Sequence, residues 1–288
     1  MPVEGLTADA LAQHVKSIPT LPTVLTELSR RMEDPKTSSD DLAQVILQDQ
    51  AISSKVLKLV NSPFYGYSGR INTINQGIVI LGFNAVKNLV LSTSVLEAFK
   101  GARSGEAFRM DHLWVHSASV AGAAKLLAER AGGADPEEAF VAGLLHDIGK
   151  ILLWISEPKL LTGCIAASKT HRIPLSDVER KVIGFGDNEL AAVLAEKWKF
   201  PTSLKDALRW RIQPEFAGAN TPLAACIHCA NILCMAMGAS PVQPAVLPIP
   251  ETKAWELLGL HHDDRLRNIL AELPLRIESA RAFVLTRY

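Results

Sequence analysis

The sequence predicts an all-α protein built from many helices. Apolar residues recur at intervals of three and four in nearly every segment, and almost no segment alternates apolar and polar residues as a strand would. Two helix-start signals support this fold class: Ser38 with Asp41 three residues later, and Asp135 followed by Pro136. With 48% apolar residues over 288 positions, the chain is long enough to bury a substantial core.

The first part of the chain, residues 1–105, is predicted to form one helical lobe. Proline and glycine breaks separate helices at residues 9–18, 23–32, 38–46, 52–60, 74–81 and 84–99. The loop before residue 74 contains Tyr65, Tyr67 and Arg70. Tyrosine and arginine are enriched at binding hot spots, so these residues are a candidate partner surface. Packing of the loop against the rest of the chain is the alternative explanation.

A polar stretch near residues 100–106 marks the start of a second helical lobe at residues 106–240. Asp135 is predicted to cap a helix that continues through the apolar run ending at Ile155, with Glu138 reaching back to the capping residue. The remaining region, 241–288, combines a proline-rich connection with C-terminal helices. The other helices of these two regions are predicted at residues 113–131, 174–183, 188–197, 202–210, 222–237, 255–258 and 264–273.

Charge and targeting signals limit the function classes. Thirty basic residues offset thirty acidic residues, which argues against a general electrostatic affinity for nucleic acid or anionic membranes. The N-terminus has no signal-peptide pattern, and polar residues interrupt each apolar run before it reaches membrane-spanning length. The four cysteines suit a reducing compartment. We therefore expect a cytoplasmic protein without membrane insertion.

His146 and Asp147 lie side by side within an otherwise apolar segment. A buried carboxylate beside a buried imidazole is costly unless a charge compensates it, and a divalent cation often does so. His116 shares a helical face with apolar residues 4, 7 and 11 positions later, so it is expected to point inward as well. The three residues are therefore candidate metal ligands. The alternative is that both histidines are hydrogen-bonded core residues.

The order of these motifs resembles the HDOD family, the HD-related output domain of bacterial signalling proteins, over roughly residues 15–240. The N-terminal half matches in IPTLPTVLTEL, in the Asn61-Ser62 pair and in the Ile-Leu-Gly turn at Gly82. The second half matches in LWVHSASVA, EEAFVAGLLHDIGK and LAEKWKFP. A small departure is Gln50, where the family usually has proline. The resemblance implies an N-terminal helical lobe packed on an HD-like lobe.

The resemblance also implies a metal site that has lost ligands. Catalytic HD proteins bind metal through a first histidine, the His-Asp pair and later residues, and His116, His146 and Asp147 match the first three positions. A family histidine falls at Asp187, and the expected His-His pair falls at Arg211 and its neighbour. A guanidinium has no lone pair to donate to a metal and never loses its charge. The resemblance therefore predicts a vestigial and empty site of His116, His146, Asp147 and Asp187.

Arg211 and Lys150 are the candidate cations that replace the metal, because buried carboxylates still need a counter-charge. Two-metal phosphoester hydrolysis needs two ions, so the sequence predicts no catalytic residue and no cofactor, with a divalent metal expected only if the HD site is still occupied. The resemblance implies a non-catalytic output or adaptor protein that binds other signalling proteins, such as receiver, kinase or second-messenger proteins. The alternative is a one-metal HD-type phosphohydrolase acting on a nucleotide or cyclic dinucleotide.

Overall fold

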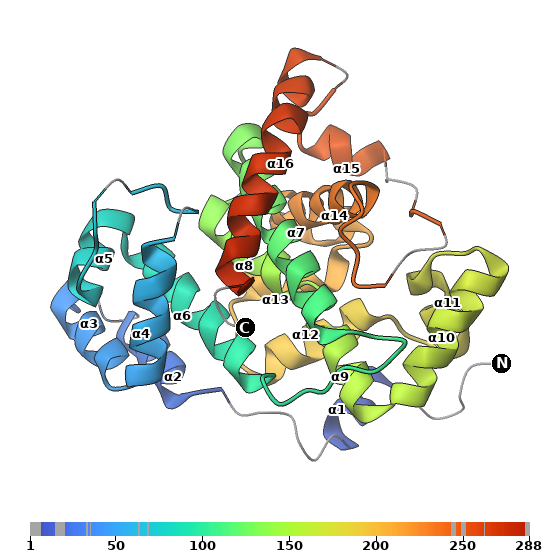
Figure 1. Cartoon of the computed structure of the whole chain (residues 1–288), viewed down its shortest axis with the longest axis horizontal. Coiled ribbons are helices and arrows are strands. Elements are labelled where there is room, and N and C mark those ends of the chain that lie inside the picture. The colour runs from blue at the N-terminus through green and yellow to red at the C-terminus, as the bar shows by residue number, and fades with distance from the viewer. Residues whose placement is uncertain are drawn as a thin grey trace. The chain divides into compact units, whose positions relative to one another are not determined.

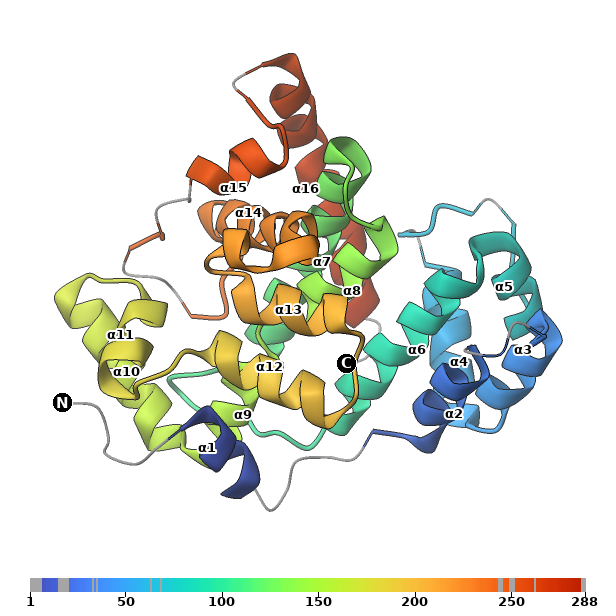
Figure 2. The same cartoon turned by 180° about the vertical axis from the view of Figure 1, so that it is seen from behind.

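The computed structural model of this chain is helical throughout its regular parts (Figures 1 and 2). It describes residues 7–14, 21–32, 34, 36–62, 64–67, 69–242, 246–248, 252–261 and 263–285. No strand occurs among these residues, which confirms the predicted all-α class. The helices form two compact units: the smaller one lies within residues 19–101, and the larger one comprises the helix that precedes this segment and the helices that follow it.

The smaller unit contains five consecutive helices: α2 (Thr23–Met32), α3 (Ser39–Leu47), α4 (Gln50–Val60), α5 (Ile74–Leu81) and α6 (Phe83–Ala98). The predicted capping box is present before α3, since Ser38 and Asp41 exchange side-chain to backbone hydrogen bonds. Asn61 closes the loop that follows α4. Its amide donates to the carbonyl of Ile71 at 2.7 Å and its oxygen accepts from the Ile71 N–H at 2.8 Å.

The larger unit contains the candidate metal ligands His116, His146 and Asp147, and α7 runs through its centre (Figure 1). Its helices are α1 (Ala8–His14), α7 (Met110–Ala131), α8 (Pro136–Leu145), α9 (Ile148–Ser156), α10 (Pro158–His171), α11 (Leu175–Val182), α12 (Asp187–Lys197), α13 (Thr202–Trp210), the 3-10 turns η1 (Pro214–Phe216) and η2 (Gly218–Asn220), α14 (Thr221–Ala236), α15 (Thr252–Leu257) and α16 (Asp264–Leu285).

Glycine lets two helices approach α7 closely. A Cβ atom at Gly143 of α8 would lie 2.7 Å from the Cα atom of Ala121. A Cβ atom at Gly122 would lie 2.7 Å from the carbonyl oxygen of Arg276 on α16. Because the glycines have no side chain at these crossings, α7 packs closely against α8 and α16. His116 therefore lies on a firmly held helix.

Two predicted helices differ from the observed ones, and one observed helix was not predicted. The helix predicted from Asp135 to Ile155 is two helices, because Asp147 leaves helical geometry (φ −102°, ψ 13°) and Arg211 takes the carbonyl of His146. The prediction missed α10, although Pro158 at its first turn is a start signal. The last helix continues past Pro274 to Leu285, since Arg276 and Arg281 bind Glu129 and Ser119 on α7.

The cap at Asp135 forms only in part. Asp135 Oδ1 accepts from the Glu138 N–H at 2.8 Å, as predicted. The Glu138 side chain does not reach back to Asp135, because it accepts a hydrogen bond from Ser203 on α13 instead.

Two helical stretches, 136–156 and 218–236, are long and apolar enough to cross a membrane by length and composition alone. Within their most apolar windows, 78% and 56% of the residues are buried inside the protein. Burial to this extent is typical of helices that pack in a protein core.

Candidate functional site

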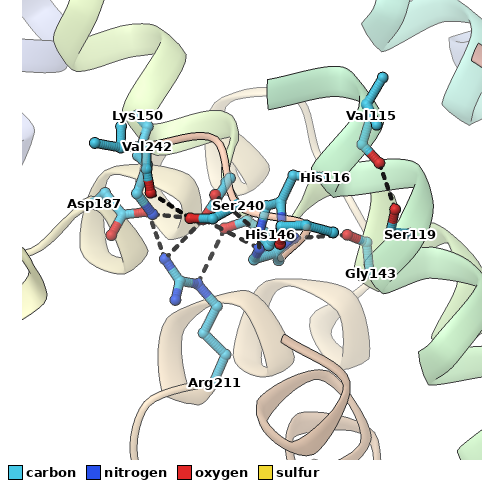
Figure 3. A network of polar contacts seen from close by, with 12 residues as sticks. Val115, His116, Ser119, Gly143, His146, Lys150, Asp187, Arg211, Ser240 and Val242 are labelled. Carbon is cyan, nitrogen blue, oxygen red and sulfur yellow. Dashed lines mark hydrogen bonds and ion pairs between the residues drawn. The ribbon is translucent and has the colours of Figure 1, made fainter. Parts of the chain in front are cut away.

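Three residues of metal-binding type meet where α7 crosses the turn between α8 and α9; Figure 3 labels two of them, His116 and His146. His116 lies on α7, and His146 and Asp147 form the turn. The two Nε2 atoms are 3.2 Å apart, and His146 Nε2 is 3.2 Å from Asp147 Oδ1. The other carboxylate oxygen of Asp147 is 3.7 Å from His116 Nε2. All three side chains are buried.

Backbone carbonyls determine which ring nitrogen of each histidine carries the proton. His116 Nδ1 lies 2.8 Å from the carbonyl of Ala239, and His146 Nδ1 lies 2.7 Å from the carbonyl of Gly143. A carbonyl only accepts hydrogen bonds, so both Nδ1 atoms carry the proton. In neutral rings both Nε2 atoms then present lone pairs, and these two lone pairs face each other beside the Asp147 carboxylate.

Two cations balance the carboxylates next to the histidines. Arg211 Nη2 lies 2.5 Å from Asp187 Oδ2 and 3.4 Å from Asp147 Oδ1. Lys150 Nζ lies 2.6 Å from Asp147 Oδ1 and 3.0 Å from Asp187 Oδ2. The four charged side chains come from α9, the turn before it, α12 and the end of α13, and their charges sum to zero. Such buried pairs are strongly destabilising to break because the remaining charge loses its partner.

The protonation states follow from burial and from these charges. Burial lowers the pKa of His146 to about 3 and also lowers the pKa of His116, so both rings are neutral near pH 7. Burial opposes ionisation of Asp147, but the positive charges of Lys150 and Arg211 outweigh it and hold the pKa of Asp147 well below its usual range. Arg211 and Lys150 likewise lower the pKa of Asp187 against the effect of burial.

Backbone contacts hold Arg211 in place. Its Nε donates to the carbonyl of His146 at 3.1 Å. Its own carbonyl accepts from Nδ1 of His228 on α14 at 2.9 Å. Sequence reasoning placed His228 on an apolar helix but did not predict this contact with Arg211.

Glu179 is a residue that sequence reasoning missed. It lies on α11, is fully buried, and accepts from the Asp187 N–H at 3.1 Å through Oε2. Its Oε1 has no hydrogen-bond partner among the described residues. Burial and the Asp187 carboxylate raise the pKa of Glu179 to about 8. In sequence it looks like an ordinary exposed acid of a short polar helix.

The raised pKa of Glu179 predicts a pH-dependent stability. From about pH 4.5 to about pH 8 the unfolded chain loses this proton while the native protein keeps it, so the free energy of unfolding falls as pH rises. We expect Glu179→Gln to flatten that fall, measured by urea unfolding at several pH values. Glu196→Gln, an exposed substitution on α12, is the control. An unchanged slope in Glu179→Gln would contradict the assignment.

The donor set fits one divalent ion and does not fit two. The ligand atoms of His116, His146 and Asp147 lie within 4.8 Å of one another, and the bare Nε2 lone pairs have no donor among the described residues. Histidine ligands of metals commonly donate their other N–H to a carbonyl, as both rings do here. A second ion would need Asp187, whose carboxylate is already paired with Arg211 and Lys150.

The candidate partner residues lie in the other unit. Tyr67 is 43% exposed, Arg70 is exposed and Tyr65 is half-buried, with Phe64 packed edge-on against its ring at 5.2 Å. They belong to the loop between α4 and α5, away in sequence from every residue of the histidine site.

Comparison with known proteins places the chain in a family. The HDOD domain matches residues 18–214. The chain belongs to the HDOD family. An HDOD domain protein of unknown function from Geobacter sulfurreducens has a similar structure, with a TM-score of 0.78 and 25% identity over 96% of this chain and 95% of that one. A Shewanella amazonensis protein, provisionally described as a phosphohydrolase, gives 0.73 and 25% over 95% and 97%.

One curated relative is longer than this chain. An uncharacterized protein of Treponema pallidum is 26% identical over 232 residues, covering 78% of this chain. The match spans only 44% of that protein's own length. The HDOD assignment rests on the family match to residues 18–214 and not on this relative.

Proposed function

We propose that this HDOD protein is a signalling output or adaptor protein that acts by binding and not by two-metal phosphoester hydrolysis. The contact of Arg211 Nη2 with Asp187, at 2.5 Å, carries the proposal. A second metal ion would need the Asp187 carboxylate as a ligand. That carboxylate is already paired with the fixed cation of Arg211. Two-metal hydrolysis uses one ion for the attacking oxygen and one for the leaving oxygen.

Partners in this proposal are other cytoplasmic signalling proteins, of the receiver, kinase or second-messenger classes. Tyr65, Tyr67 and Arg70 are the proposed contact surface, because two of the three are exposed and all three are of hot-spot type. Family membership supports a signalling role.

A one-metal phosphohydrolase acting on a nucleotide or cyclic dinucleotide is the second candidate. The facing Nε2 lone pairs of His116 and His146 favour it, since a cation completes such an arrangement. An ion held by these residues and Asp147 would supply Lewis-acid charge to an anionic ligand. Lys150 would stay paired with both carboxylates and Arg211 would stay on Asp187, so neither would serve as a proton donor.

Metal content and hydrolysis together test the two candidates. We expect at most one transition-metal ion per chain by mass spectrometry of untagged protein, and no hydrolysis of bis(p-nitrophenyl) phosphate in excess Mn²⁺. His146→Gln is the matched variant, because it removes one ligand atom and keeps a polar side chain. Two ions per chain, or Mn²⁺-dependent hydrolysis that is lost in His146→Gln, would overturn the adaptor proposal.

A further inference from the structure

A pocket opens from the histidine site and extends between α10, α11 and α14. It is open to solvent at its mouth and has a volume of about 120 Å³. Its polar floor includes His116, Asp147 and Arg211. Its walls are mainly apolar and are formed by Ile165, Pro174, Leu175, Ile212, Ile232, Met235, Pro241, Val242, Val246 and Pro248.

The charges that line this pocket leave a positive excess. Lys150, Lys169 and Arg211 are the cationic lining residues, and Asp147 and Asp187 are the only acids among the described lining residues. Lys150 and Arg211 are paired with these acids, which leaves one positive charge unbalanced. The charged groups of the floor therefore sum to zero, and the unbalanced positive charge lies outside the floor.

Lys169 carries that excess charge. It is an exposed residue of α10 and makes no ion pair with any residue that the structure describes. Ser176 and Asn231 add polar groups to the same lining, and Asn231 Oδ1 is buried without a hydrogen-bond partner in the described part of the chain. A water molecule that enters with a ligand can donate the hydrogen bond that this buried acceptor lacks.

We propose that this pocket binds an amphipathic organic anion with a single negative charge, its charged group at Lys169 and its apolar body against the walls of α10, α11 and α14. The inference deepens the proposed function and rests on it in one respect: Asp147 and Asp187 are balanced by Lys150 and Arg211. Lys169 would repel an organic cation. A small inorganic anion would make no contact with the apolar walls. In the adaptor role, the bound anion is the input to which the protein responds.

A matched series of small ligands tests the ligand class on the full chain treated with a chelator. Isothermal titration calorimetry compares octanoate, octylamine and acetate. We expect octanoate to bind one per chain and octylamine to bind at least about tenfold more weakly. Acetate lacks the apolar tail and is expected to bind at least about a hundredfold more weakly. Equal binding of octanoate and octylamine would overturn the role of charge, and equal binding of acetate would overturn the role of the walls.

Two variants and one control locate the site. Lys169→Glu reverses the unbalanced charge and is expected to weaken octanoate about tenfold. Lys159→Glu makes the same change at an exposed residue of α10 that does not line the pocket, and should leave binding unchanged. Leu175→Asp places a carboxylate on the wall at the first residue of α11, where a helix N-terminus tolerates it, and should abolish binding.

Equal effects of Lys169→Glu and Lys159→Glu would contradict this location, and so would full binding by a folded Leu175→Asp variant. The octanoate titrations and the hydrolysis assay test the two proposals separately. Mn²⁺-dependent hydrolysis would overturn the adaptor proposal without changing the octanoate titrations. Loss of octanoate binding with no hydrolysis would overturn only the ligand class.

Discussion

Replacing Arg211 by methionine is expected to lower the free energy of unfolding by about 3–5 kcal/mol, because it leaves buried carboxylates without one of their two cations. Arg211 is 5% exposed and contacts Asp187, Asp147 and the carbonyl of His146. Methionine keeps much of the side-chain volume but removes all of these donors. The measurement is urea unfolding followed by circular dichroism, with calorimetry to detect separate unfolding of the two units.

The neighbouring residue supplies the control for this prediction. Arg209→Met changes an exposed arginine whose guanidinium lies 5.6 Å from the Trp210 ring, and should alter stability by no more than about 0.5 kcal/mol. Adding Asp187→Asn to Arg211→Met should recover part of the loss, since it removes an unpaired charge. Equal stability of Arg211→Met and Arg209→Met would show that Arg211 does not neutralise the site.

Gly149→Ala is expected to destabilise the protein by at least about 3 kcal/mol, because there is no room for one methyl group. A Cβ atom at Gly149 would lie 1.8 Å from the carbonyl oxygen of Asp187 and 2.9 Å from the amide nitrogen of Ala191. These are backbone atoms of α12, so α9 and α12 must separate. Asp187 would then move away from Arg211, and the charged group would be disrupted as well.

Gly163→Ala is the matched control for this packing prediction. Gly163 lies within α10, and no heavy atom lies within 4 Å of the Cβ position. Alanine in a helix interior is favoured over glycine by about 0.5–1 kcal/mol, so this variant should be more stable than the wild type. Scanning calorimetry of both variants checks the contrast. A Gly149→Ala protein with an unchanged melting temperature would contradict the observed contact between α9 and α12.

The all-α class was predictable because helical periodicity is a local property of the sequence. The inward direction of His116 was predictable for the same reason, since apolar residues share its helix face. The break at Asp147 was not, because it depends on Arg211 taking the carbonyl of His146 from 65 positions away. An apolar run carries no sign of a contact so distant in sequence.

The residues that support the histidines and the charged side chains of the site were the least predictable part. The carbonyls of Gly143 and Ala239, which fix the histidine tautomers, belong to residues whose side chains carry no chemical signal. Glu179 has the side chain of a surface residue, and its burial depends on the packing of α11 against α10 and on its contact with the Asp187 N–H. Arg211 was identifiable because the family pattern has histidine there, which makes the change in chemistry visible.

The neutral group of Asp147, Lys150, Asp187 and Arg211 has a consequence for the evolution of this family. A substitution that removes one charge strands another in the interior, so single changes at these positions are selected against. A lineage can leave this state only by replacing an acid and a base together, or by acquiring an ion at the same step. Among HDOD relatives, the residues at positions 187 and 211 should therefore covary as a pair. That pair can sort the family into members that carry a fixed organic cation and members that recruit a metal.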